Sequence, residues 1–473
     1  MSHLARPIVL ESRPTQHFTL RERMEQFHIP GVSVAVVHGG KLAWAQGFGV
    51  ARAGTPDLVT ETTLFQAASV TKAITATATL RLVDERVVSL DEDVNSYLRT
   101  WRLPDNQLTL REKVTLRRII THTAGTSVHG FSSTPPGQSP PSLLDLLEGR
   151  PPASNEPVRV TAEPGKQFQY SGGGVLIEQL ALMNVTGRSY EDLISEYVLE
   201  PVRMTHSVIE QPLSEAHAKD AAAAHDGEGH AYPGLYPVNQ LATGLWTTPT
   251  DLLRWASAIA AAARGEKPAL LSQPLAVEMV TRSREDSPTG LGTFVDGTGD
   301  ASHFGHGGRN EGYISEVIYF PNREQGAAVM LNGDAGYSLL QSLLYAIGDE
   351  YGWPEYHAPE VAMNEPTAEL IDELVGTYVN REQPAIRVEL SRHERRLFAH
   401  CTKLGVSSEA VLGGPDTFFT IEDFVWFNAI RSAHGTVDAL QFAGGHMDRV
   451  PGGHTQVQEQ ATVPETLNVR PSF

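Results

Sequence analysis

Strand-like and helix-like segments are unevenly distributed along this chain, and their distribution restricts the fold more than any other feature. Apolar runs typical of β-strands occur at residues 32–37, 42–49, 291–295, 312–320 and 326–331. The first two flank the turn His38-Gly39-Gly40-Lys41, which is typical of an antiparallel hairpin. Between about residues 71 and 285 the spacing of apolar residues is helical instead. The two ends of this region therefore have to meet in one sheet, with a mainly helical part inserted between them.

The pattern changes again towards the C-terminus. Residues 358–366 contain prolines and indicate a linker. Beyond it, short apolar runs recur at residues 386–390, 397–401, 409–412, 417–420, 424–427 and 439–442, a spacing typical of a small all-β domain. We therefore predict an α+β fold in two domains. Residues 1–357 form an antiparallel sheet (about 20–70 and 288–352) flanked by helices, with the helical part at about 71–285, and residues 367–473 form a C-terminal all-β barrel.

Charge and cysteine content exclude several classes of function. The 473 residues carry a formal net charge of −19, which disfavours nucleic acid or an anionic membrane surface as a partner. Cys401 is the single cysteine, so we expect no intrachain disulfide and no cysteine-based zinc site. We find neither an apolar run of membrane-spanning length nor the apolar core of a secretory signal. These observations predict a cytoplasmic protein with no metal and no other cofactor.

The stretch from Phe65 to Leu80 contains a candidate nucleophile and base. We predict a strand end, a turn and then a buried helix, because the residues after the turn are small and apolar. Ser69 stands where the helix begins, and Lys72 lies one turn later on the same face. A desolvated lysine can accept the proton of a serine hydroxyl, and the helix start supplies backbone N–H groups beside it. The alternative is that Ser69 is a helix cap and Lys72 a surface residue, and the pair alone does not decide.

Two further motifs are less specific. Tyr170 precedes the glycine run Gly172-Gly173-Gly174 at the start of an apolar helix, and glycines let a backbone or a ligand approach closely. His306 lies in the segment from Gly305 to Gly308, directly before a strand. Each motif taken alone is equally consistent with an ordinary turn or loop.

Taken together, these motifs resemble those of the serine β-lactamase and penicillin-binding-protein superfamily, in its class C β-lactamase-like branch. That branch contains DD-peptidases, D-aminopeptidases, D-amino-acid amidases and esterases. The supporting stretches are residues 29–36, 120–125, 201–205 and 243–252. The resemblance covers about residues 20 to 352, and residues 370–378 resemble the opening of the lipocalin-like barrel that is attached to some members.

The resemblance implies roles for the three motifs. Ser69 corresponds to the acylated nucleophile and Lys72 to its hydrogen-bonded base partner. Tyr170 matches the tyrosine that moves a proton between the nucleophile and the leaving group, and the sequence does not settle whether it or Lys72 is the main base. The resemblance also places the oxyanion hole at the backbone N–H groups of Ser69 and Arg309. His122 lies in a stretch common in the family, and we interpret it as structural.

The motifs around His306 and Tyr170 depart from the family pattern. His306 with Gly308 forms an H-x-G version of a motif that is K-T-G in many relatives, so a fixed positive charge is lost. Gly307 replaces the threonine that relatives use on a β-lactam carboxylate, and Gly172 replaces an asparagine that contacts the lysine and the substrate amide. These changes argue against an efficient β-lactamase. We include Gly172, Gly307, Gly308 and Arg309 among the predicted substrate-binding residues, with Arg309 as a replacement cation.

We therefore predict a serine hydrolase that forms an acyl-enzyme with a small-molecule or short-peptide substrate, with a preference for amides, as in a D-aminopeptidase or DD-peptidase. A carboxylesterase, then a β-lactamase, then a non-catalytic binding protein are the alternatives. The sequence has no G-x-S-x-G elbow and no G-x-G-x-x-G after a strand, which argues against a common α/β-hydrolase and a dinucleotide enzyme. Three roles stay open for the barrel: covering the site, restricting substrate size, or mediating assembly into a homo-oligomer.

Overall fold

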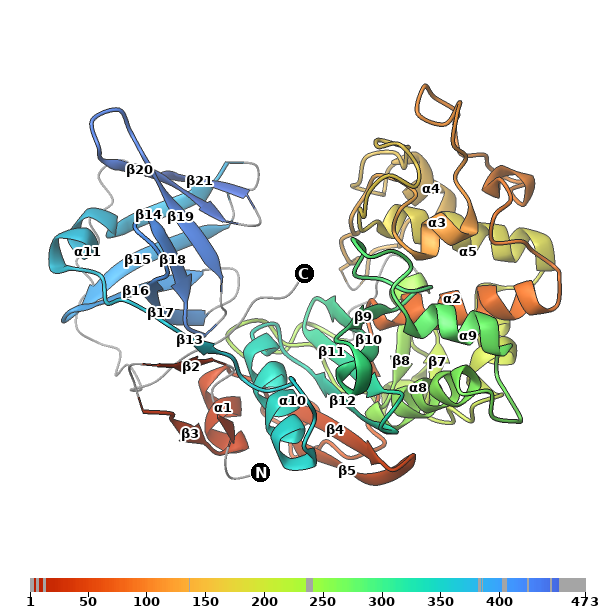
Figure 1. Cartoon of the computed structure of the whole chain (residues 1–473), viewed down its shortest axis with the longest axis horizontal. Coiled ribbons are helices and arrows are strands. Elements are labelled where there is room, and N and C mark those ends of the chain that lie inside the picture. The colour runs from red at the N-terminus through yellow and green to blue at the C-terminus, as the bar shows by residue number, and fades with distance from the viewer. Residues whose placement is uncertain are drawn as a thin grey trace. The chain divides into compact units, whose positions relative to one another are not determined.

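The computed structural model divides into two compact units that we describe separately (Figure 1). The sheet unit comprises residues 30–225 and 231–332, and the barrel unit comprises residues 1–29, 226–230 and 333–473. The domain boundaries at residues 357 and 367 stay predictions. The structure describes residues 4–5, 8–11, 14–135, 137–234, 241–381, 384, 386–401, 406–422, 425–442 and 445–450.

The sheet unit contains a six-stranded antiparallel sheet built from both ends of its chain segment. Its strands are β4 (Gly31–His38), β5 (Lys41–Gly49), β9 (Phe294–Asp296), β10 (His303–Asn310), β11 (Tyr313–Phe320) and β12 (Gln325–Leu331). Their order is β5-β4-β12-β11-β10-β9, so the early hairpin pairs with the late strands through β4 and β12, with Val34 opposite Val329. The predicted α+β class and the joining of distant strands are confirmed.

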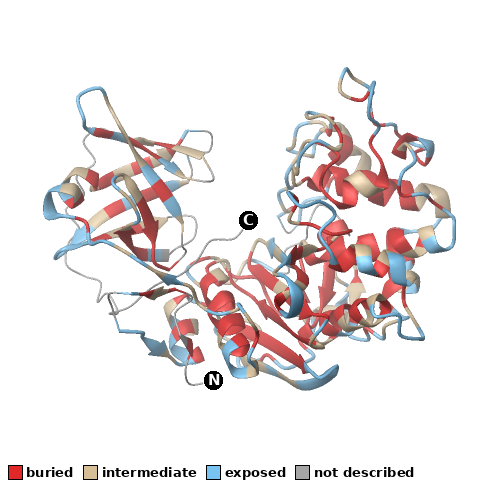
Figure 2. Cartoon of the chain, viewed as in Figure 1, coloured by how far each residue is buried: buried red, intermediate tan, exposed pale blue. Residues whose placement is uncertain are grey.

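Helices make up most of the regular secondary structure between the two groups of strands, although irregular segments connect them. They are α2 (Val70–Asp84), α3 (Leu116–Ile120), α4 (Leu143–Glu148), α5 (Gly172–Thr186), α6 (Tyr190–Ile194), α7 (Glu215–Ala218), α8 (Pro249–Ala263) and α9 (Gln273–Val280). Helix α8 packs on β4, β11 and β12. Helix α2 is buried along most of its length, as Figure 2 shows in red. The hydroxyls of Thr75, Thr77 and Thr79 each donate to the carbonyl four residues earlier, as Thr75 does to Thr71.

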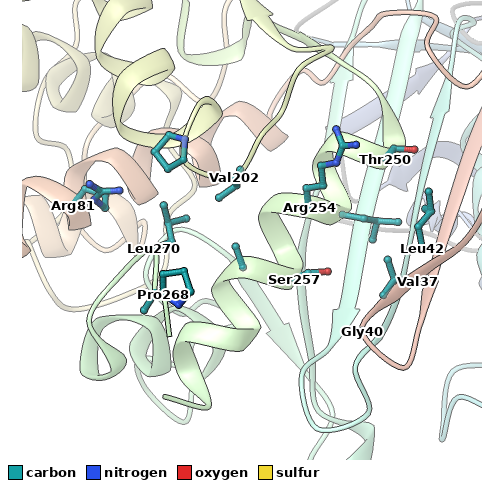
Figure 3. Close-up of a pocket in the computed structure, with 14 residues that line it drawn as sticks. Val37, Gly40, Leu42, Arg81, Val202, Thr250, Arg254, Ser257, Pro268 and Leu270 are labelled. Atoms are coloured by element: carbon teal, nitrogen blue, oxygen red, sulfur yellow. The ribbon is translucent and has the colours of Figure 1, made fainter. Parts of the chain in front are cut away.

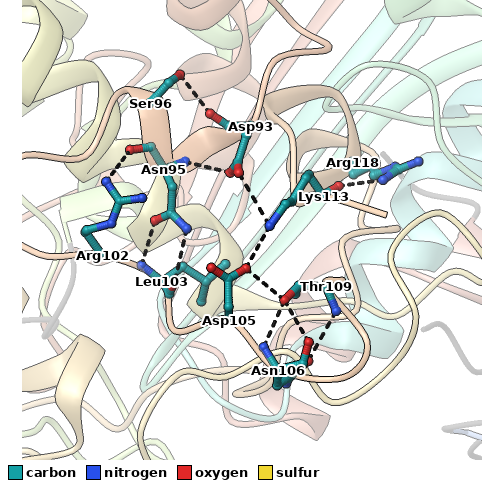
Figure 4. Close-up of polar contacts among 10 residues, drawn as sticks. All are labelled: Asp93, Asn95, Ser96, Arg102, Leu103, Asp105, Asn106, Thr109, Lys113 and Arg118. Atoms are coloured by element: carbon teal, nitrogen blue, oxygen red, sulfur yellow. Dashed lines mark hydrogen bonds and ion pairs between the residues drawn. The ribbon is translucent and has the colours of Figure 1, made fainter. Parts of the chain in front are cut away.

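The segment between α2 and α3 is mostly irregular. The sequence around residues 90–98 predicts the start of a helix, but only the 3₁₀ turn η1 (Val94–Ser96) forms there. Side chains replace the missing helical bonds: Asn95 bonds both main-chain groups of Leu103, and Lys113 lies 2.8 Å from Asp105 and 3.9 Å from Asp93 (Figure 4). Short polar side chains that bond the backbone in this way compete with helix formation.

The barrel unit contains a closed barrel of eight antiparallel strands. They are β14 (Gly376–Asn380), β15 (Arg387–His393), β16 (Arg396–Cys401), β17 (Val406–Leu412), β18 (Thr417–Thr420), β19 (Trp426–Arg431), β20 (Val437–Phe442) and β21 (Gly445–Arg449). The prediction of a C-terminal all-β barrel is confirmed, although it lacked the first and last strands, and Phe424 lies outside the described residues. Tyr378, Phe418, Phe427 and Leu440 fill the interior.

The remainder of the barrel unit packs short N-terminal elements near the barrel. Helix α1 (Leu20–Gln26) begins with a capping box between Thr19 and Glu22. Its Arg23 forms a fully buried ion pair of 3.0 Å with Glu422. Strands β2 (Val9–Leu10) and β13 (Glu360–Val361) pair in parallel, β1 (Leu4–Ala5) pairs with β3 (His17–Phe18), and the unit also contains α10 (Tyr337–Tyr351) and α11 (Ala368–Leu374). Among the described helices, none has both the length and the apolarity that crossing a bilayer requires.

Candidate active site

The start of α2 brings Ser69 and Lys72 into contact. The Lys72 ammonium nitrogen Nζ lies 3.0 Å from Ser69 Oγ. Lys72 is only 5% exposed, and the Ser69 hydroxyl makes no capping bond to the helix. The alternative of a helix cap beside a surface lysine therefore does not describe this pair. Burial of an amine beside a hydroxyl is the arrangement in which a lysine can serve as a base.

Main-chain contacts fix the position of Ser69. Strand β6 (Phe65–Gln66) pairs with β8 (Leu245–Thr247), and the Ala67 N–H donates to the Leu245 carbonyl over 2.8 Å. The Thr71 hydroxyl donates to the Ala68 carbonyl over 2.6 Å. Ala68 has a positive φ of 48°, a conformation that is uncommon for residues other than glycine. Such strain persists only where surrounding contacts hold it, and it is frequent at active sites.

Tyr170 lies next to this pair, just before α5. Its ring centroid is 5.5 Å from Lys72 Nζ. The following residue, Ser171, caps α5 by accepting from the Gly174 N–H over 2.9 Å. The Ser171 N–H donates to the His122 imidazole over 3.3 Å, and the His122 ring lies 4.2 Å from the Tyr170 ring. The cap and the imidazole together fix the chain on which Tyr170 stands.

Strand β10 completes the arrangement on the other side of Ser69. A Cβ added at Gly308 would lie 2.2 Å from the Ala67 carbonyl oxygen and 2.9 Å from the Ser69 nitrogen, so only glycine fits there. Arg309 follows, exposed, opposite Ile314 of β11. Gly307 differs from Gly308, because an added Cβ would have only the Ser315 carbonyl oxygen nearby, at 3.9 Å.

His306 is a buried and neutral member of the site. Its Nδ1 lies 2.5 Å from the Gly307 carbonyl oxygen, a distance at which the Nδ1–H donates. Burial, followed by the positive charge of Lys72, lowers the pKa of His306 to about 3. The imidazole is therefore uncharged at pH 7 and supplies no cation at this motif.

Several residues near the predicted site were not identified as site residues from the sequence. Phe294 stacks 6.5 Å from Tyr170 and lies 5.1 Å from His306, and His129 lies 4.9 Å from Tyr170. Glu178 of α5 is 1% exposed and accepts from the Thr79 hydroxyl of α2 over 2.6 Å. Burial raises the pKa of Glu178 to about 8, although the Thr79 bond and the charge of Lys72 oppose that rise. For Glu178, the sequence offers one signal: it is the single acidic residue of helix α5.

A cavity elsewhere in the sheet unit is lined by other residues. One cavity of about 500 Å³ lies between α8, the end of α2 and the β4–β5 hairpin, with Arg81, Arg254 and Leu270 among its lining residues (Figure 3). None of the predicted site residues lines it. Within the described part of the chain, no cluster of three or more His, Cys, Asp or Glu side chains is placed to hold a metal ion.

Comparisons with known proteins agree with this fold. A family model described as Beta-lactamase matches residues 19–350, so the chain belongs to the Beta-lactamase family, a family of serine hydrolases. Protein flp of Staphylococcus aureus (strain N315) is 28% identical over 228 residues, which are 48% of this chain and 43% of that protein. The matched region thus spans less than half of this curated relative.

Two solved structures share the fold over most of the chain. The structure of SurE with D-Leu has a TM-score of 0.58 and 22% identity, covering 91% of this chain and 97% of that one. The octameric penicillin-binding protein homologue from Pyrococcus abyssi has a TM-score of 0.60 and 21% identity, covering 90% and 98%. At these identities the likeness concerns the fold, which is β-lactamase-like with a C-terminal eight-stranded barrel.

Proposed function

We propose that this protein hydrolyses short amide or ester substrates through an acyl-enzyme on Ser69, with a preference for amides of peptide type. The observation that carries the proposal is the 3.0 Å contact between Lys72 Nζ and a Ser69 hydroxyl that caps nothing. A buried amine that contacts a serine hydroxyl can accept its proton, which makes the serine a nucleophile.

The proposed reaction follows from the geometry. Ser69 Oγ attacks the substrate carbonyl carbon while its proton passes to Lys72 or Tyr170. The backbone N–H groups of Ser69 and Arg309 stabilise the oxyanion that forms. Tyr170, beside Lys72, returns the proton to the leaving amine or alcohol. A water molecule then attacks the acyl-enzyme with the same groups acting in reverse, which regenerates Ser69 and releases the acid.

The preference for peptide-type amides rests on a relative's ligand and on the motif around His306. The SurE structure contains D-Leu, which makes D-amino-acid derivatives a reasonable first choice of substrate. The neutral His306 and the glycine at position 307 leave that motif without a cation or hydroxyl for a β-lactam carboxylate. An esterase is the second candidate, because Gly172 offers no side-chain amide for an acyl-amide substrate. Assembly into an octamer, as printed for the Pyrococcus abyssi homologue, is a further proposal for this chain.

The test is the intact mass of the protein after exposure to a fluorophosphonate. Wild type is expected to gain one adduct and the Ser69→Ala variant none. Ser96→Ala, an exposed serine elsewhere in the sheet unit, serves as the matched control and is expected to label like the wild type. Turnover of a D-alanine anilide, a short-chain chromogenic ester and nitrocefin then assigns the substrate class. No adduct and no turnover would overturn the proposal in favour of a binding protein.

A further inference from the structure

Residues 128–134 form a segment, which we call the strap, that joins two elements of the candidate site. At one end, the Gly172 and Gly173 N–H groups of α5 donate to the carbonyls of His129 and Val128, each over 3.0 Å. At the other end, the Ser133 hydroxyl donates to the Glu311 carboxylate, directly after β10. The strap therefore runs from the helix that follows Tyr170 to the strand that carries Arg309.

The strap has one fixed placement because its contacts with α5 are tight. A Cβ added at Gly172 would lie 3.0 Å from the His129 carbonyl oxygen and 3.2 Å from the Phe131 ring. Val128 adopts a positive φ of 64°, which is unusual for a β-branched residue. A strained backbone persists only where its surroundings hold it. The glycine at position 172 is thus what allows the strap to pack this closely against the start of α5.

His129 is the exposed member of a group of rings around Tyr170. The buried His122 ring lies 4.2 Å from Tyr170 and the Phe294 ring 6.5 Å, while His129 lies 4.9 Å away and is exposed. Its imidazole has no hydrogen-bond partner among the residues that the structure describes. Partial burial and the charge of Lys72 lower the pKa of His129, so the ring is neutral at pH 7. A substrate group that reaches Tyr170 therefore meets an uncharged aromatic surface.

We propose that His129 lines an acyl-group subsite and selects substrates whose acyl side chain is aromatic, by packing its ring against that side chain beside Tyr170. This inference rests on the proposed acyl-enzyme at Ser69. An acyl group bound to Ser69 lies near Lys72, whose Nζ is 3.0 Å from Ser69 Oγ and 5.5 Å from the Tyr170 ring, so the substituent on its carbonyl is within reach of His129. Paired aromatic rings prefer centroid separations of about 4.5–7 Å, and the His129–Tyr170 and Phe294–Tyr170 separations of 4.9 and 6.5 Å lie in that range.

The test compares p-nitrophenyl phenylacetate with p-nitrophenyl acetate, which share a leaving group and differ in the acyl side chain. The ratio of their kcat/KM values is expected to fall about tenfold in His129→Ala, the size of one aromatic packing contact. His129→Phe is expected to keep most of the wild-type ratio. His434→Ala, an exposed histidine of the barrel, is the matched control and should not change it.

A second variant keeps the inference testable if His129 variants fold poorly. Gly172→Ala adds one methyl group against the strap and displaces His129, so the ratio is expected to fall in this variant too, and an unchanged ratio would count against the inference. An unchanged ratio in His129→Ala, or loss of the ratio in His129→Phe, overturns the inference alone. A wild type that neither labels with a fluorophosphonate nor hydrolyses either ester overturns the proposed function and this inference together.

Discussion

Replacing Glu178 with glutamine is expected to stabilise the protein at neutral pH and to remove a pH dependence of folding. Burial raises the pKa of this carboxyl from an ordinary 4.5 to about 8, so the folded protein keeps a proton at pH 7 that the unfolded chain has released. Because the pKa of this carboxyl is raised on folding, its contribution to the free energy of unfolding is fully present below pH 4.5. That contribution is lost as the pH rises from 4.5 to about 8. Glutamine has nearly the same shape, can still accept from the Thr79 hydroxyl, and does not ionise.

The magnitude follows from the two pKa values. One pKa unit corresponds to about 1.4 kcal/mol, and pH 7 lies 2.5 units above 4.5. Glu178→Gln is therefore expected to raise the free energy of unfolding by about 3 kcal/mol at pH 7 and by less than about 1 kcal/mol at pH 5.

Urea unfolding followed by tryptophan fluorescence measures this difference. Trp255 of α8 donates to Thr77 of α2 over 3.0 Å, so the signal reports on the helix next to Glu178. Glu156→Gln, at an exposed glutamate, is the matched control and should show no such dependence. A Glu178→Gln variant that is less stable than the wild type at pH 7, or equally stabilised at pH 5 and pH 7, would refute the reasoning.

Three further predictions concern other parts of the molecule. Gly307→Thr is expected to fold normally and to raise nitrocefin hydrolysis about tenfold, because position 307 has room for a side chain and a hydroxyl there can bond a carboxylate. By contrast, Gly308→Ala should abolish activity. If Gly307→Thr gives no gain, the proposed role of position 307 is contradicted. Between pH 7 and pH 5 the wild type is expected to lose about 2 kcal/mol more free energy of unfolding than His306→Gln. The reason is that the pKa of His306 is lowered in the folded protein, so the unfolded chain takes up the proton first. Equal losses for the two proteins in urea unfolding would contradict this. Glu422→Gln is expected to cost about 3–5 kcal/mol in the same assay, since it removes the negative charge that balances the buried Arg23 guanidinium. A cost below about 1 kcal/mol would show that the ion pair is unimportant.

Elements with strong periodicity were predictable from the sequence. The sequence predicts strands at residues 32–37 and 326–331, which correspond to β4 and β12, because their apolar runs fill strands that are buried on both sides. The barrel strands that alternate clearly were found as well. The first and last barrel strands were not, because β14 begins at a glycine and β21 carries His446, Asp448 and Arg449 among five residues.

The candidate site was only partly predictable, because its members meet through tertiary packing. Ser69 and Lys72 share one helix turn, so their contact follows from helical spacing. The sequence predicts a strand only from residue 312, whereas His306 already lies inside β10. The three glycines of β10 give that strand little intrinsic β propensity. The rings of His129 and Phe294 come from segments more than a hundred residues apart, and no local pattern indicates that both reach Tyr170.

The division of the chain into units also constrains the order of folding. Residues 1–29 belong with residues 333–473, and Arg23 finds its buried partner only at Glu422. During synthesis the Arg23–Glu422 ion pair can form only after residue 422 has been made, while residues 30–225 and 231–332 can already pack together. Closing so long a loop costs entropy before any contact is gained. Helix α1 is thus expected to reach its final place late, and until then it stays open to proteases and chaperones.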